Sequence, residues 1–113
     1  MLDQDVVVWQ HVTERRAAAI RALVTDELIE EHRRNPRGHH SDALDRVLRF
    51  FRVAPIPGKE IVIESVPFET CHVGVMTGVP GQPAEVLPEP YGSYEETLHA
   101  IFVRRIARLR GEL

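Results

Sequence analysis

Cysteine is nearly absent from this 113-residue sequence, which contains Cys71 alone. A single thiol excludes an internal disulfide and says nothing further about the redox compartment. Long apolar runs are missing too, because no stretch approaches the roughly 20 residues that a membrane-spanning helix needs. The acidic start, Met1 to Asp5, leads into a short apolar run from Val6 to Trp9 and lacks the basic region of a signal peptide. We therefore expect a cytoplasmic protein that does not enter a membrane.

Two common catalytic motifs are also missing. Gly78 and Gly81 flank prolines in a turn and do not form a phosphate-binding loop between a strand and a helix. The only serines are Ser41, Ser65 and Ser93, and none stands in a Gly-x-Ser-x-Gly nucleophile elbow. The sequence thus contains no self-sufficient catalytic site of these classes.

Charge and length set further limits. The net charge of −3 excludes a global basic field that would attract nucleic acid or anionic lipid. Of 14 basic residues only Lys59 is a lysine, and arginine is the cation that protein interfaces favour. A hydrophobic fraction of 43% and a length of 113 residues suit one globular domain. We predict a single domain over residues 1–113.

The residues from about 5 to 52 are expected to be helical. The first helix runs from about Asp5 to Val24 and the second from Glu27 to Arg34, after a cap at Thr25 or Asp26. Asn35-Pro36 stops the second helix. A third helix, capped by Ser41 or Asp42, reaches Phe51 or Arg52. Its apolar residues at i, i+3, i+4 and i+7 form an amphipathic stripe: Leu44, Val47, Leu48 and Phe51.

A small sheet is predicted for residues 60–87 and a last helix for residues 93–110. Ile61 to Val66 and Thr70 to Thr77 alternate as strands do, and Ala84 to Leu87 is a candidate third strand. Ser93 and Glu96 form a capping box, in which each side chain accepts the other's backbone N–H. The fold class is α+β, with three N-terminal helices, a two- or three-stranded antiparallel sheet and one C-terminal helix.

Two Glu-x-x-His motifs match a spacing that binds metal in other proteins. They comprise Glu69 with His72 and Glu96 with His99. Di-iron proteins carry such pairs on helices, where both side chains share a face. The first pair here falls on a predicted strand, where residues three apart face opposite sides. We therefore predict that these four side chains do not converge on one metal.

Other histidines and the cysteine are assigned structural roles. Cys71 and His72 are strand neighbours that face opposite sides, so Cys71 is expected to be buried and inert. His32, His39 and His40 gather around the Pro36 turn, where a divalent metal site is one reading and solvated turn histidines are the favoured one.

The last helix carries four arginines: Arg104, Arg105, Arg108 and Arg110. A helix C-terminus favours cations because they offset its partial negative charge. The aromatic platform that single-stranded nucleic acid would need is missing beside them. A nucleic-acid-binding or regulatory module using this helix is the alternative function.

Three stretches resemble the small subunit of N,N-dimethylformamidase. They are Glu30-Glu31-His32 with Asn35-Pro36-x-Gly38, Arg46-Val47 with Phe51-Arg52, Pro55 and Gly58-Lys59, and Glu95-Glu96 with His99-Ala100-Ile101-Phe102 and Arg105-Ile106. The resemblance implies an accessory subunit of an amide hydrolase. It places the catalytic residues and an iron ion on a separate, large subunit, and none of them in this chain.

A docking surface for that large subunit is predicted around the end of the third helix. Arg49 and Arg52 lie three residues apart, beside the apolar stripe. Pro55, Pro57 and Lys59 follow in a stiff loop that is cheap to order on binding. The competing hypotheses are the nucleic-acid-binding module and a small standalone metalloenzyme.

Overall fold

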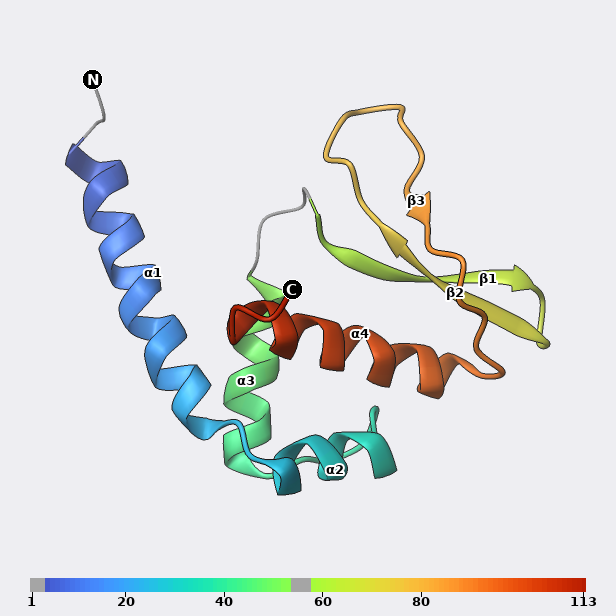
Figure 1. The fold of residues 1–113 in the computed structure, drawn as a ribbon, viewed down its shortest axis with the longest axis horizontal. Coiled ribbons are helices and arrows are strands. Elements are labelled where there is room, and N and C mark those ends of the chain that lie inside the picture. Colours follow the sequence, from blue (N-terminus) through green and yellow to red (C-terminus); the bar gives the residue numbers. More distant parts are fainter. Residues whose placement is uncertain (1–3, 54–57) are drawn as a thin grey trace.

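The computed structural model describes residues 4–53 and 58–113 of the chain. Three helices precede a sheet, and a fourth helix follows it (Figure 1). The elements are α1 (Gln4–Leu23), α2 (Asp26–Arg34), α3 (Asp42–Arg52), β1 (Glu60–Val66), β2 (Thr70–Val75), β3 (Glu85–Val86) and α4 (Tyr94–Leu109). The predicted α+β class and order of elements are confirmed, and the third strand is two residues long.

Side-chain caps fix where three of the helices begin. The hydroxyl of Thr25 accepts the N–H of Leu28 at the start of α2, and Ser41 accepts that of Leu44 at the start of α3. Ser93 likewise accepts the N–H of Glu96. The reciprocal half of the predicted capping box differs, because the Glu96 carboxylate accepts the N–H of Gly92 instead of Ser93.

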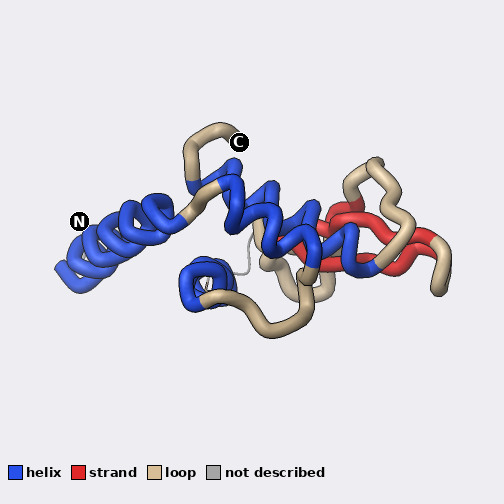
Figure 2. The backbone as a smooth tube through the Cα atoms, turned by 90° about the horizontal axis from the view of Figure 1, so that it is seen from below, coloured by secondary structure: helices blue, strands red, loops and turns tan. Residues whose placement is uncertain are grey.

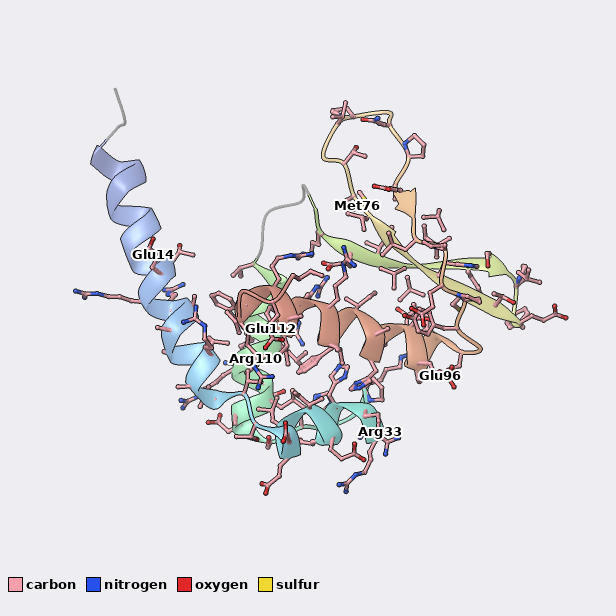
Figure 3. All side chains as sticks on the ribbon, viewed as in Figure 1. Glu14, Arg33, Met76, Glu96, Arg110 and Glu112 are labelled. Atoms are coloured by element: carbon pink, nitrogen blue, oxygen red, sulfur yellow. The ribbon has the colours of Figure 1, made fainter. Side chains whose placement is uncertain are left out.

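The ends of α4 complement its dipole. Figure 3 shows Glu96 at its N-terminal end and Arg110 at its C-terminal end. Negative charge near the first turn and positive charge near the last both stabilise a helix.

The sheet is antiparallel with the strand order β1-β2-β3. The register pairs Val62 with Val73 and Ile61 with Gly74, and it shifts between Glu64 and Val66. Cross-strand partners share a face, so the two valines lie on one side of the sheet and Ile61 lies with Gly74 on the other. The side chains of Ile61 and Ile63 lie so close over Gly74 that a Cβ there would come within 2.4 Å of the Ile63 Cδ1. The absence of a side chain at Gly74 thus leaves room for Ile61 and Ile63 to pack over β2 on this face of the sheet.

Helix α4 joins the helical part to the sheet. It packs against β1 and β2 on one side and against α2 on the other, and Figure 2 shows it running along the sheet. The main core lies where α2, α3 and α4 meet, and its buried members are Val24, Leu28, Leu44, Val47, Phe51, Phe102 and Ile106. The predicted stripe of α3 is therefore largely buried, with Leu48 packed against the core at its edge.

Helix α1 packs against α3, and its N-terminal half extends away from the other elements (Figure 1). The Arg21 Nε donates a hydrogen bond to the Leu109 carbonyl at 3.0 Å, which ties the end of α1 to the end of α4. Across the residues that were described, every helix falls short of the length and apolarity that crossing a bilayer requires.

Candidate functional site

The predicted docking residues lie at the C-terminal end of α3. Arg49 and Arg52 are both exposed, and the Lys59 Nζ donates to the Arg52 carbonyl at 3.0 Å. Pro55 and Pro57 lie outside the described residues. The two arginines border different hollows: Arg49 lines a groove between α1 and α3, whereas Arg52 lines a cavity between α3 and α4. They therefore frame the end of α3 from two sides.

The groove between α1 and α3 has an apolar floor and a basic rim. Its volume is about 340 Å³, and its lining is Arg16, Ala19, Ile20, Arg46, Arg49, Phe50 and Val53. Val53 is 75% exposed at its end. Arginine around a small apolar surface is typical of protein interfaces.

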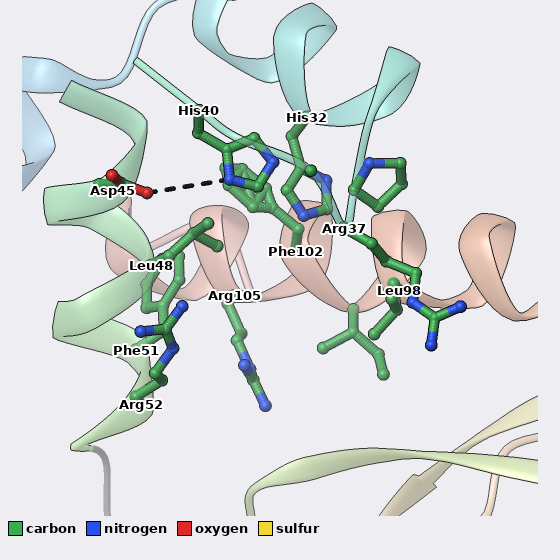
Figure 4. A pocket seen from close by; sticks show the side chains of 13 residues that line it. His32, Arg37, His40, Asp45, Leu48, Phe51, Arg52, Leu98, Phe102 and Arg105 are labelled. Atoms are coloured by element: carbon green, nitrogen blue, oxygen red, sulfur yellow. Dashed lines mark ion pairs between the residues drawn. The ribbon is translucent and has the colours of Figure 1, made fainter. Parts of the chain in front are cut away.

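A second feature is a contact between two histidines from α2 and α4. The Nδ1 atoms of His32 and His99 are 3.0 Å apart, so one ring must donate and the other accept. His32 is 3% exposed and stacks on Phe102 with ring centroids 4.1 Å apart. Figure 4 shows the His32 ring beside Phe102 at the wall of the α3–α4 cavity. The contact holds only while at least one of the two rings is neutral.

His40 completes the polar wall of this cavity, whose volume is about 280 Å³. Its Nε2 is 2.6 Å from the Asn35 carbonyl, and its Nδ1 is 3.9 Å from the Asp45 carboxylate, the pair marked in Figure 4. The favoured expectation of solvated turn histidines is wrong for His32 and His40, because burial and hydrogen bonds hold both rings. The expectation is correct for His39, which is exposed.

Burial, together with the smaller effects of the nearby His99 and His40, lowers the pKa of His32 to about 4. Burial also lowers the pKa of His99, with help from the positive charge of Arg33 and against the pull of Glu30. A low pKa means that the charged ring is disfavoured in the folded protein. Both rings are therefore neutral at pH 7.

The two histidines of the Glu-x-x-His motifs have separate partners. His72 Nδ1 lies 2.8 Å from the Ser65 Oγ on the sheet, whereas His99 contacts His32 between the helices. The Glu96 carboxylate caps α4. Within the described ranges, no group of three or more His, Cys, Asp or Glu side chains is arranged to hold a metal ion.

The arginines of α4 converge on one buried carboxylate, which no sequence motif predicts. Glu60, at the start of β1, has a side chain only 1% exposed. Arg108 contacts it at 2.8 Å and Arg105 at 3.4 Å, and Arg105 also donates to the Glu60 carbonyl at 2.9 Å. The Arg104 Nε is 3.1 Å away but is not aligned for a hydrogen bond.

Burial alone would raise the pKa of Glu60, but Arg108 and Arg105 more than offset it, so the pKa lies below its ordinary value. The carboxylate is therefore ionised and joins the sheet to α4. Three of the four arginines proposed for nucleic-acid binding are engaged in this way. That use weakens the nucleic-acid reading, which needs cations directed at phosphates.

Cys71 is buried, as expected, at 4% exposure on β2. Its backbone forms a two-way bridge with Tyr91, and the two N–H to carbonyl distances are 2.9 and 2.8 Å. The bridge fixes the segment that leads into α4.

Comparison with known proteins identifies the family. The chain matches the family model described as N,N-dimethylformamidase alpha subunit over residues 7–113. It is 33% identical over 105 residues to the N,N-dimethylformamidase alpha subunit of Alcaligenes sp, covering 88% of this chain and 79% of that protein. The chain belongs to the N,N-dimethylformamidase alpha subunit family. It is also 32% identical over 90 residues to the Paracoccus aminophilus alpha subunit, where the match covers 77% of this chain and 63% of that protein.

The alpha subunit is the small subunit in this family, so the predicted resemblance is confirmed. The stretches that carried it meet in space. His32 from the first stretch contacts His99 from the third, and Phe51 from the second packs edge-on against Phe102 with centroids 6.0 Å apart. The family resemblance thus maps to the junction of α2, α3 and α4.

Proposed function

We propose that this chain is the small, non-catalytic accessory subunit of an N,N-dimethylformamidase-like amide hydrolase. Its role is to support the assembly of a large, iron-dependent catalytic subunit. In that reaction water cleaves the C–N bond of the formamide and yields formate and dimethylamine. The iron on the large subunit would polarise the amide carbonyl or activate the water.

The observation that carries this proposal is the family match over residues 7–113, since an alpha subunit implies a heteromeric partner. The site chemistry agrees with it. Glu60 is occupied by arginines of α4, His32 and His99 bond to each other, and Glu96 caps a helix. These acids and bases serve contacts within the fold.

The docking surface in this proposal is the end of α3, with Arg49, Arg52 and Lys59. The groove beside Arg49 offers an apolar floor that a partner side chain can fill, and the arginines around it select acidic neighbours.

The first test is activity with and without the partner. The large subunit is identified by a reading frame next to that of this chain, and the two are co-expressed. We expect the pure small chain to leave dimethylformamide unchanged and the complex to release dimethylamine. Turnover by the pure small chain, abolished by a point mutation in it, would contradict the proposal.

The second test addresses the docking surface. Reversing two charges with Arg49→Glu and Arg52→Glu should weaken capture of the large subunit by about tenfold, because each surface pair contributes up to about 1 kcal/mol. The melting temperature of the small chain should fall by only a few degrees, because both side chains are exposed and what they lose is the interaction of two cations with the C-terminal end of α3. The matched control reverses Arg15 and Arg110, two exposed arginines elsewhere. If the docking variant co-purifies as the wild type does, at the same salt resistance, this surface is not the interface.

A further inference from the structure

The turn between β1 and β2 contains an unusual backbone conformation. Phe68 has a φ of 64°, the left-handed region, and every other described residue with positive φ is a glycine. A side chain with a Cβ is disfavoured there, and bulky residues are rare. The Glu69 N–H bonds to the Val66 carbonyl, so Phe68 is the third residue of a β-turn, and a positive φ at that position normally requires glycine or asparagine. The conformation of the turn therefore does not account for a phenylalanine.

Packing does not account for it either, because Phe68 is 97% exposed. The turn is held by other groups. The Phe68 N–H donates to the Glu64 carboxylate at 3.2 Å, and the Glu69 N–H donates to the Val66 carbonyl at 3.0 Å. Ser65 donates to the Thr70 carbonyl at 3.2 Å. The benzene ring thus contributes nothing to the turn that presents it.

The surroundings of the ring indicate what it would contact. Val66, just before the turn, is 43% exposed, so the apolar surface extends beyond the ring. Glu64 and Glu69 on either side are exposed acids. Figure 1 places this turn at the opposite end of the molecule from α1. A projecting aromatic ring flanked by carboxylates suits an apolar pocket with a basic rim.

We propose that Phe68 is an interface anchor that inserts into an apolar, basic-rimmed pocket on the large subunit. This inference rests on the proposed function, and it names a second contact region, remote from Arg49 and Arg52. The backbone of the turn is already ordered by hydrogen bonds, so docking costs little beyond the rotamer freedom of the ring itself. An exposed aromatic ring that becomes fully buried is the kind of residue that dominates binding energy.

The test is Phe68→Gly, because glycine relieves the backbone conformation while it removes the ring. We expect the isolated variant to melt at the wild-type temperature or above it, since glycine adopts positive φ without a steric penalty. The dissociation constant for the purified large subunit should rise at least about 30-fold, the effect of an interface hot spot. Phe68→Tyr should restore binding. The control is Val79→Ala, at a residue 57% exposed in the β2–β3 loop, which should bind as the wild type does.

The outcomes separate the two proposals. If the wild-type chain does not bind the large subunit at all, the proposed function fails and takes the anchor with it. If the wild type binds and Phe68→Gly binds equally well, the anchor alone is refuted. A lower melting temperature of Phe68→Gly with unchanged affinity would assign the ring to the fold. Concentration-dependent self-association that disappears in Phe68→Gly, with large-subunit binding intact, would assign it to contacts between copies.

Discussion

The buried histidine pair predicts a loss of stability in mild acid. His32 has a folded-state pKa of about 4, whereas its ordinary value is 6.5. The unfolded chain therefore binds the proton more tightly than the folded protein does. The contribution of His32 to the free energy of unfolding is fully present above pH 6.5, and it is lost as the pH falls from 6.5 to about 4.

The size of the effect follows from the same two values. Each pKa unit corresponds to about 1.4 kcal/mol, so His32 contributes on the order of 3 kcal/mol across the whole window and about 2 kcal/mol of it is lost by pH 5. The structural cause is twofold. The charged ring would be buried at 3% exposure, and two protonated rings would bring two Nδ1–H groups together at 3.0 Å.

The assay is urea unfolding at several pH values for the wild type and His32→Phe. Phenylalanine keeps a flat ring on Phe102 but cannot take up a proton, so its stability should fall about 2 kcal/mol less between pH 7 and pH 5. His39→Phe, at an exposed ring, is the control and should follow the wild type. Several carboxyl groups have pKa values below their ordinary value, and both variants retain them. Equal losses in the wild type and His32→Phe, or an NMR titration of His32 near pH 6.5, would refute the reasoning.

Two further predictions concern buried side chains of the sheet. Glu60→Gln should lower the free energy of unfolding by about 3 kcal/mol or more, because it leaves the guanidinium groups of Arg105 and Arg108 without their carboxylate. Chemical denaturation measures this loss. The control is Glu112→Gln at an exposed residue, which should change stability by less than about 0.5 kcal/mol. A loss for Glu60→Gln no larger than that control would show that the cluster is not structural. Cys71, at 4% exposure, should react with a thiol reagent only as fast as the protein opens, so urea should accelerate labelling strongly; rapid labelling of the native protein would contradict its burial.

The fold was predictable where the signal is local. The caps at Ser41 and Ser93 and the stop at Asn35-Pro36 depend on residues a few positions apart, and the structure places the helix ends there. The stripe of α3 was visible because helical spacing alone decides which side chains share a face. The reciprocal bond of Glu96 differs from the prediction, since the carboxylate reaches back one residue beyond Ser93 and accepts the N–H of Gly92.

The site contacts were not predictable, because they join distant parts of the chain. His32 and His99 are separated by 67 positions and Glu60 and Arg108 by 48, and no short spacing encodes either pair. Weak signals did exist. His32 follows Leu28 by four residues, so it shares the buried face of α2. Glu60 precedes Val62 by two residues and so shares the inward face of β1, where a carboxylate requires cations.

Helix α4 takes part in both of these contacts and so joins the sheet to the helical part of the molecule. Glu60 binds it to the sheet through Arg105 and Arg108, and His99 binds it to α2. The Cys71–Tyr91 bridge fixes the segment leading into it. The proposed anchor Phe68 therefore projects from a hairpin that is tied to α4 at its other end. The groove lined by Arg49 lies on the other side of the molecule, between α1 and α3. A partner that contacts both regions would span α4, and loosening the Glu60 cluster should then weaken binding through Phe68 more than through Arg49.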